Sequence, residues 1–279
     1  MKILYLTKGD HVDYQNDCLL IGLKELFGSD VVDHNKQLHN YIAFDKDAAS
    51  RLYGKGFSVT RVLPDDTADR SDITAKIKNK FYDFIVYGSI WRFSDYITDI
   101  LKYYPPNKVI AVDGEDETNI HPVYNLGVLY FKRELIYDHA RLYPISFAIP
   151  TDKIKYCTTK TRDFSICDPR DRSTYIYKNE EGYYKGYQEA RYGVTTKKAG
   201  WDCMRHYEIM ANGCLPYFIG IDKCPDLTMV SFPKDLCKKL LAGSKYDELQ
   251  EDFYNHLIQH NTTQSMAKSF VNKIHNTLN

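Results

Sequence analysis

The chain has 279 residues, and its 37 lysine and arginine residues balance 37 aspartate and glutamate residues, so the formal net charge at pH 7 is zero. A neutral chain without a basic tail argues against a dominant electrostatic attachment to nucleic acid, and its length is comfortable for two domains of ordinary size. The seven cysteines are an odd number without a C-x-x-C pair, so neither a disulfide framework nor a zinc site is indicated.

Short apolar runs alternate with helical patterns through the first half of the chain. Residues 2–7 predict a buried parallel strand, residues 19–27 a helix that Gly28 ends, and residues 31–33 the next strand. The alternation continues with helices over 67–80 and 93–103 and strands over 84–88, 109–112 and 128–131. We therefore predict a Rossmann-like α/β domain over residues 1–143.

The second half repeats the alternation after a segment with a proline at each end. Pro144 and Pro150 would stiffen a segment that crosses between domains, so we place the boundary there. Strands are predicted over 164–167, 215–219 and 229–232, and helices over 202–212, 245–260 and 263–278. Residues 144–279 thus predict a second Rossmann-like domain with a helical tail.

The segment from residue 197 to residue 218 has the pattern of a loop, a helix, a glycine stop and a strand. Gly200 permits a close backbone approach just before the helix, whose free N–H groups suit a diphosphate. Arg205 and Glu208 share a helical face, so the arginine can clamp a phosphate while the carboxylate accepts from two ribose hydroxyls. On spacing alone, a simple surface ion pair is the alternative.

Further groups join this candidate donor site. Lys197 and Lys198 add positive charge to the loop before the helix. Gly213 ends the helix in a tight turn at the carboxyl edge of the sheet, where open α/β sheets bind ligands. Arg172 follows the predicted strand over 164–167 and is placed to reach the donor phosphates.

The run R-x-x-E-x-x-A-x-G-x-x-P, which begins at Arg205, resembles the donor-site signature of retaining-type (group 1) and spore-protein-like glycosyltransferases of the GT-B class. That class has two facing Rossmann-like domains with the active site in the cleft between them. The resemblance implies that Glu208 holds the nucleotide ribose and that Arg205, with Lys197 or Lys198, neutralises the diphosphate. Many members carry a second glutamate seven residues before the ribose-binding one, and Trp201 stands at that position here.

The resemblance also implies the reaction. It predicts a hexosyl- or pentosyltransferase that uses a UDP-sugar as its donor substrate and requires no cofactor or metal. The compact length resembles bacteriophage-type enzymes, some of which glycosylate a hydroxymethylated pyrimidine in DNA, so our first interpretation of the acceptor is a hydroxymethylated cytosine in phage duplex DNA. Transfer to a glycan, a surface polymer or a small molecule is the alternative, and a non-catalytic nucleotide-binding protein is an alternative of another class.

Candidate catalytic residues follow two strands of the first half, at the edge where such sheets carry functional groups. Asp10, His11 and Asp13 follow the first strand, and each is a candidate general base for an acceptor hydroxyl. The alternative for the two aspartates is a helix N-cap. Asp113 and Asp116 follow the strand over 109–112 as candidate bases or acceptor ligands, with a solvated acidic turn as the alternative.

The amino-terminal residues lack the long apolar region of a signal peptide, and no stretch approaches membrane-spanning length. Unpaired cysteines fit a reducing compartment. We therefore expect a cytoplasmic protein, in the host cytoplasm if it is viral, that does not associate with membranes and is a monomer or a weak homo-oligomer.

Overall fold

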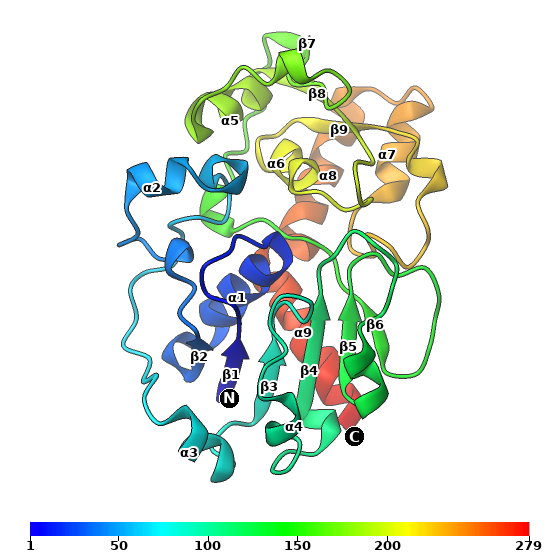
Figure 1. Ribbon diagram of the computed structural model, residues 1–279. Coiled ribbons are helices and arrows are strands. Elements are labelled where there is room, and N and C mark those ends of the chain that lie inside the picture. Colours follow the sequence, from blue (N-terminus) through cyan, green and yellow to red (C-terminus); the bar gives the residue numbers. More distant parts are fainter. Residues whose placement is uncertain (279) are drawn as a thin grey trace.

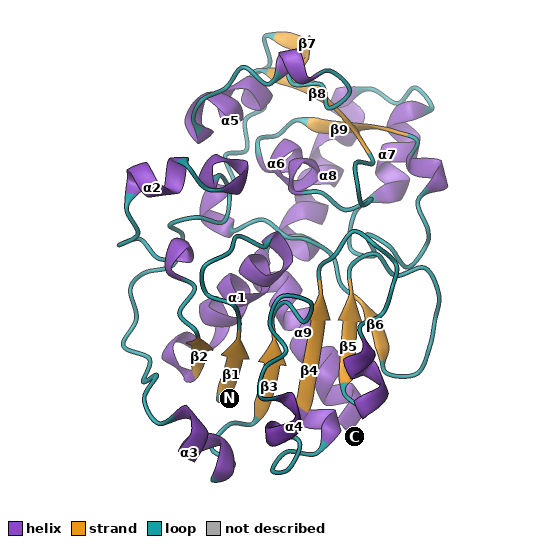
Figure 2. Cartoon of the chain, in the orientation of Figure 1, coloured by secondary structure: helices purple, strands orange, loops and turns teal. Residues whose placement is uncertain are grey.

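The first half of the chain forms a six-stranded parallel sheet, seen in the computed structural model of residues 1–278 (Figures 1 and 2). The strand order is β2-β1-β3-β4-β5-β6. The strands are β1 Ile3–Leu6, β2 Val31–His34, β3 Phe84–Tyr87, β4 Val109–Asp113, β5 Leu129–Lys132 and β6 Leu142–Pro144. All residues of β1, β3, β4 and β5 are buried, as parallel strands covered on both faces must be, which explains why their apolar runs were recognisable in the sequence.

The long helix of this half is α1, Tyr14–Phe27. The Asp13 carboxylate caps it by accepting hydrogen bonds from the N–H groups of Gln15 and Asn16, at 3.1 and 3.2 Å. The other helices are short: α2 Lys46–Ser50, α3 Ile73–Lys78 and α4 Ile97–Ile100. The predicted helices over 67–80 and 93–103 were too long, because Asp72 and Tyr96 adopt left-handed backbone conformations directly before α3 and α4.

A second, three-stranded parallel sheet lies in the other half, with the order β7-β8-β9. Its strands are β7 Arg162–Phe164, β8 Ala190–Thr196 and β9 Leu215–Ile219, and its helices are α5 Glu180–Gln188, α6 Met204–Ala211, α7 Lys234–Leu241 and α8 Tyr246–His260. The strand expected over 229–232 is wrong, because Met229 takes a positive φ and these residues form turns. The central strand β8 was not predicted, since it lacks an apolar run. Gly193 in β8 permits close packing on α6, where a Cβ would lie 2.9 Å from Ile209.

The carboxyl-terminal helix α9, Thr263–Leu278, returns to the first half and packs along α1 (Figure 1). Gly22 of α1 makes this possible, because a Cβ there would clash with the carbonyl of Thr263. Phe270 of α9 packs on Phe131 of β5, with ring centroids 4.5 Å apart. Both sheets therefore share one apolar core through α1 and α9. The domain boundary after residue 143 stays a prediction.

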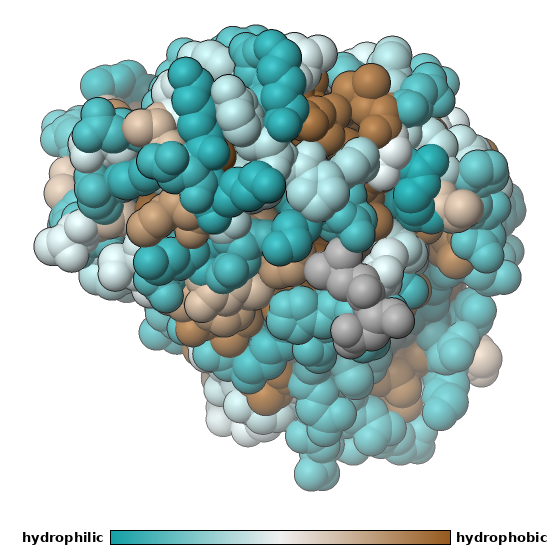
Figure 3. All heavy atoms as spheres, turned by 90° about the horizontal axis from the view of Figure 1, so that it is seen from below, coloured by the Kyte–Doolittle hydropathy of each residue, from teal (hydrophilic) through white to brown (hydrophobic). Residues whose placement is uncertain are grey.

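The surface away from the second half is mixed in character. Seen from below the first sheet, it is mostly hydrophilic, with apolar groups in separate patches (Figure 3). No helix within residues 1–278 has both the length and the apolarity needed to cross a bilayer. The predicted α/β fold of two facing Rossmann-like halves is confirmed by the two parallel sheets and the cleft that both halves line.

Candidate functional site

A cleft of about 860 Å³ is lined by residues of both halves, among them residues that follow β1 and β4 at the carboxyl ends of the first-sheet strands. Open α/β sheets bind ligands at this edge. Most of the residues predicted from the sequence line it, namely His11, Asp13, Asp116, Arg172, Lys198, Arg205 and Glu208. Four do not, namely Asp10, Asp113, Lys197 and Gly213. The cleft therefore brings together predicted groups from both halves of the chain.

Arg205 lies in the first turn of α6 and is the most unusual charge in the cleft. Its Nη1 is buried and has no hydrogen-bond partner among residues 1–278, and no carboxylate of that range lies within ion-pairing distance. Burial opposes its charge, but the neighbouring Cys203 and tyrosines raise the pKa of Arg205, so the guanidinium is charged. A buried cation without a partner is costly, and an anionic ligand would satisfy it.

Glu208 lies one turn further along α6 and is buried, with its residue only 6% exposed. Its Oε2 accepts a hydrogen bond from the Tyr183 hydroxyl at 2.8 Å, and its Oε1 accepts one from the Ser58 hydroxyl. Burial raises the pKa of Glu208, while these two hydrogen bonds and Arg205 lower it. The alternative of a surface ion pair between Arg205 and Glu208 is wrong, because Glu208 is buried, Arg205 is half-buried in the cleft, and the two side chains form no ion pair within the described chain.

Two further cations lie near Arg205. Arg172 lines the cleft from the turn after β7. Lys198 also lines it, and its Nζ donates to the Pro169 carbonyl, which ties the loop before α6 to the loop after β7. Lys197 instead lies 5.6 Å from the ring centroid of Trp201, outside the cleft.

Gly213 ends α6 away from the cleft. It has a φ of +67°, and a Cβ there would clash with the Cys157 backbone carbonyl. Its own carbonyl accepts a hydrogen bond from the Tyr246 hydroxyl at 2.8 Å. Gly213 was predicted to take part in donor binding, but it lies outside the cleft, and its close neighbours are the Cys157 backbone and the Tyr246 hydroxyl.

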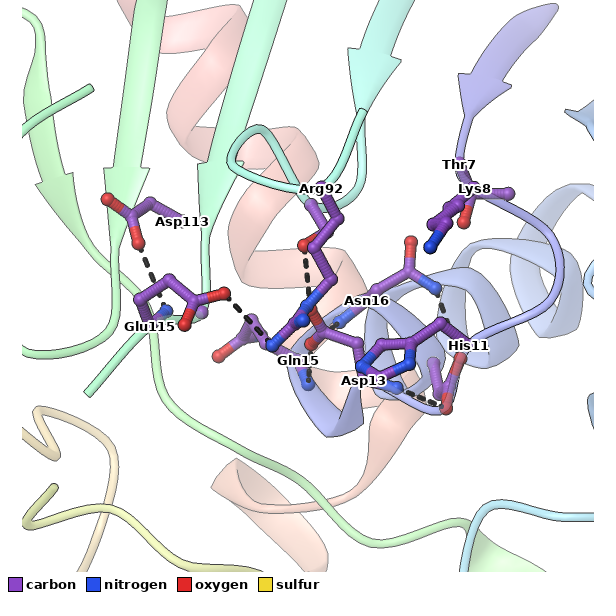
Figure 4. A network of polar contacts seen from close by, with 12 residues as sticks. Thr7, Lys8, His11, Asp13, Gln15, Asn16, Arg92, Asp113 and Glu115 are labelled. Atoms are coloured by element: carbon purple, nitrogen blue, oxygen red, sulfur yellow. Dashed lines mark hydrogen bonds and ion pairs between the residues drawn. The ribbon is translucent and has the colours of Figure 1, made fainter. Parts of the chain in front are cut away.

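The first-half wall of the cleft is built around Arg92 (Figure 4). Its Nε donates to Asp13 at 3.2 Å, and its Nη2 pairs with Glu115 at 3.0 Å. Asp13 also caps α1 and accepts from Ser89 at 2.7 Å, so its carboxylate is fully engaged. The N-cap alternative for Asp13 is thus confirmed, and its carboxylate oxygens are occupied by these contacts.

Asp113 was expected as a catalytic candidate, but it is fully buried and does not line the cleft. Its carboxylate accepts hydrogen bonds from Lys132 at 2.8 Å, Trp91 at 2.9 Å and Tyr130 at 2.5 Å. This residue holds the sheet edge together. Asp10 is exposed beside Lys8, with 3.9 Å between the charged atoms, and also lies outside the cleft.

His11 and Glu115 are the groups of this wall best suited to accept a proton. His11 lines the cleft half-buried, and its ring makes no hydrogen bond to the described residues. Burial, and then Arg92, lower the pKa of His11, so the imidazole is neutral at pH 7. Burial raises the pKa of Glu115, against the opposing effect of Arg92. A neutral imidazole facing a cleft is a competent general base.

Arg133 lines the cleft and joins the two halves. The residue is 2% exposed, and its guanidinium donates to the Asp202 carbonyl at 2.6 Å and to Glu134 at 2.9 Å, and pairs with Asp116. A Cβ at Gly200 would lie 2.6 to 2.9 Å from these same three side chains of the first half. The close approach predicted for Gly200 therefore fixes the loop before α6 against the first half.

Asp202 completes this junction. Its carboxylate accepts from the Phe147 N–H at 2.7 Å and from the Tyr207 hydroxyl at 2.9 Å. Burial raises the pKa of Asp202 to about 6, although Arg133 lowers it.

Arg92, Tyr183 and Ser58 were not predicted as site residues, because their positions depend on contacts between distant segments. Among residues 1–278 no group of three or more His, Cys, Asp and Glu residues is placed to hold a metal ion.

Two parallel α/β sheets that face each other across a ligand-sized cleft define a fold of the GT-B class. No family model matches the sequence, and no curated protein matches it. One similar solved structure is an alpha-glucosyltransferase in complex with UDP and a 13-mer DNA containing a central A:G mismatch, at 12% identity, 98% coverage of both chains and a TM-score of 0.46. Another is alpha-glucosyltransferase (AGT) in complex with UDP, with the same identity and coverage and a TM-score of 0.45. MurG of Acinetobacter baumannii is similar at 11% identity and a TM-score of 0.39, over 99% of this chain and 100% of MurG.

Proposed function

We propose that this protein is a glycosyltransferase that binds a UDP-sugar in the cleft with Arg205 and Glu208. The observation that carries the proposal is the half-buried guanidinium of Arg205 in the first turn of α6, whose buried Nη1 has no partner among residues 1–278. The cap residue Cys203 makes no side-chain hydrogen bond to the N-terminus of α6 in the described chain, and although the His206 N–H donates to the Cys203 carbonyl, the N–H groups of Met204 and Arg205 are available to an anion. A diphosphate would satisfy both, and the ribose would then lie beside Glu208.

The same groups support the chemistry. Transfer breaks the bond between the sugar C1 and the diphosphate oxygen, and forms a bond from C1 to the acceptor oxygen. Negative charge develops on the leaving diphosphate, where Arg205, Arg172, Lys198 and the positive end of α6 would stabilise it. His11, on the opposite wall, would take the acceptor proton if the reaction inverts the configuration at C1.

The acceptor proposal has two candidates. The resemblance to phage-type enzymes supports a hydroxymethylated cytosine in duplex DNA as the first acceptor, which would have to be flipped into the cleft. A neutral glycan, surface polymer or small molecule is the second candidate, supported by Asp13, Glu115 and Asp116 on the first-half wall. The cytoplasmic location and the monomeric or weakly associating state stay predictions.

The donor proposal is tested by thermal stabilisation with UDP. At a UDP concentration of about 100 times Kd, binding adds about 2.7 kcal/mol to the free energy of unfolding, or about 5 to 10 °C for a chain of this size. Glu208→Gln should lose most of this shift, because the ribose hydroxyls lose a charged acceptor. Glu189→Gln is the matched control, since Glu189 pairs with Arg162 at 2.6 Å outside the cleft. Equal shifts in wild type and Glu208→Gln would reject the site.

The acceptor is tested by measuring UDP release from a panel of UDP-sugars. Duplexes with and without hydroxymethylcytosine and a set of neutral glycans serve as acceptors. Stimulation by the modified duplex alone supports DNA, and stimulation by a glycan supports the second candidate. UDP binding without release, with every donor and acceptor, would favour the non-catalytic nucleotide-binding protein.

A further inference from the structure

Residues 53–60 of the first half, here called the strap, follow α2 and contact the second half across the cleft (Figure 1). Ser58 is fully buried at the end of this crossing. Its hydroxyl donates to Oε1 of Glu208 and lies 2.9 Å from the Tyr184 hydroxyl, and its N–H donates to Glu180 at 2.5 Å. A serine that is distant in sequence thus occupies the carboxylate assigned to the donor ribose.

Two other contacts hold the strap on the second half. Lys55 Nζ donates to the Tyr177 carbonyl at 2.6 Å. The Phe57 ring stacks on Tyr183, with centroids 5.6 Å apart and an interplanar angle of 26°. Tyr183 is itself the second hydrogen-bond partner of Glu208. The strap therefore covers the carboxylate and one of its two hydroxyl donors together.

The strap backbone is strained where it makes these contacts. Lys55 and Ser58 have φ values of 58° and 68°, in the left-handed region that non-glycine residues seldom adopt. Gly54 and Gly56 also have positive φ. Such conformations persist only where surrounding contacts compensate them. Loss of the Ser58–Glu208 hydrogen bond would therefore favour release of the strap.

A serine hydroxyl and a ribose hydroxyl present the same donor group to a carboxylate. Resting on the proposed function, we propose that the strap is a displaceable occupant of the ribose subsite: Ser58 takes the place of a donor hydroxyl on Glu208, and a nucleoside diphosphate must lift the strap to bind. The ribose replaces the hydrogen bond that Ser58 gives up, while the diphosphate pairs with Arg205. The apparent affinity for the sugar donor is then the intrinsic affinity multiplied by the fraction of molecules in which the strap is open.

This mechanism separates two parts of the ligand. Inorganic pyrophosphate carries the anion for Arg205 but no hydroxyl for Glu208, so it binds without moving Ser58. UDP needs both the anion contact with Arg205 and the hydroxyl contact with Glu208. The strap therefore acts on the nucleoside end of the donor and leaves the phosphate end unaffected.

The test measures UDP and pyrophosphate affinities by calorimetry. Ser58→Ala removes the hydroxyl from Glu208, and UDP affinity should rise about tenfold, the value for one lost charge-assisted hydrogen bond. Pyrophosphate affinity should not change. Glu180 lies outside the cleft lining and accepts a hydrogen bond from the Ser58 N–H, so Glu180→Ala should also raise UDP affinity. Ser50→Ala, a surface serine that donates to the Asp47 carbonyl, is the matched control and should leave both affinities unchanged.

Hydrogen exchange supplies a direct measurement of the strap. UDP should accelerate exchange at residues 53–60 and slow it in the loop and helix over 197–208. Slower exchange of the strap with UDP would overturn the proposal, because the strap would then close on the donor. Unchanged or weaker UDP binding by Ser58→Ala would overturn it as well. If UDP neither binds wild type nor protects 197–208, the proposed function fails and the displacement fails with it; protection of 197–208 without release of the strap rejects the displacement alone.

Discussion

Replacing Arg205 with methionine should make the free protein more stable and the donor complex much weaker. Methionine keeps the apolar stem that packs in the first turn of α6, and it removes a charged group whose Nη1 has no partner in the described chain. A buried donor without a partner costs about 1 to 3 kcal/mol. We expect the free energy of unfolding to rise by about 1 to 2 kcal/mol, which corresponds to about 2 to 8 °C in Tm.

The loss of binding follows from the same group. A hydrogen bond between a guanidinium and a phosphate contributes about 1.5 to 3 kcal/mol, so the Kd for UDP should rise about tenfold to 150-fold. If Arg205 served stability, its replacement would lower both the free energy of unfolding and the affinity for UDP. Arg205→Met should move them in opposite directions, and this opposition is the diagnostic result.

The assay is chemical unfolding of the free protein, combined with calorimetric titration of UDP. Arg191→Met is the matched control, because Arg191 pairs with Asp163 at 2.8 Å on the surface of the same half. Exposed pairs contribute at most about 1 kcal/mol, so the control should be near neutral and should bind UDP normally. A less stable Arg205→Met variant, or one with unchanged UDP affinity, would refute the argument that this charge awaits an anion.

Two further predictions concern the supporting structure. Gly213→Ala should lower the free energy of unfolding by more than about 2 kcal/mol, because it combines a left-handed backbone with a clash against Cys157. The control is Gly220→Ala, which has a φ of +82° and nothing within 4 Å of the added Cβ and should cost about 1 kcal/mol. Urea titrations measure both variants, and weaker UDP binding by folded Gly213→Ala would contradict the position of Gly213 outside the cleft. The pKa of Asp202, raised to about 6 by burial, means that the folded state holds this proton more firmly than the unfolded state, so the contribution of Asp202 to stability is present below about pH 4 and is lost as the pH rises to about 6. Asp202→Asn should therefore gain on wild type as the pH rises from 4 to 7 in urea titrations, and a constant difference would contradict the raised pKa.

Strands β1, β3, β4 and β5 of the first sheet were predictable because each is buried on both faces and needs a continuous apolar run, whereas β6, which is only partly buried and ends at Pro144, was not predicted. The second sheet was harder, because β8 mixes polar and aromatic residues with Gly193 and is stabilised by its neighbours more than by its own composition. The short helices of the first half were overestimated for a related reason. Helical spacing does not reveal a left-handed residue such as Tyr96, whose conformation depends on tertiary contacts.

The candidate site separates in the same way. Arg205 and Glu208 were found because their chemistry lies within one turn of one helix, so local spacing carries the information. Asp13 and Asp113 both follow strands, as expected of functional acids, yet one caps α1 and the other is bonded to Lys132 in the core. Position after a strand fixes the edge of the sheet and leaves the direction of the side chain open. The Ser58 contact depends on two segments 150 residues apart and has no local signal.

The contrast between paired and unpaired charges identifies this site better than any single motif. Buried Arg133 contacts four carboxyl or carbonyl partners, and buried Lys132 pairs with Asp113 at 2.8 Å. A fold that satisfies those cations has the means to satisfy Arg205, and Glu208 lies three residues away on the same helix. Glu208 instead takes two hydroxyl donors, one of them on a strained strap. An arrangement that leaves the cation unpaired and gives the carboxylate exchangeable hydroxyl partners matches a ligand that carries both an anion and hydroxyls, as a nucleoside diphosphate does.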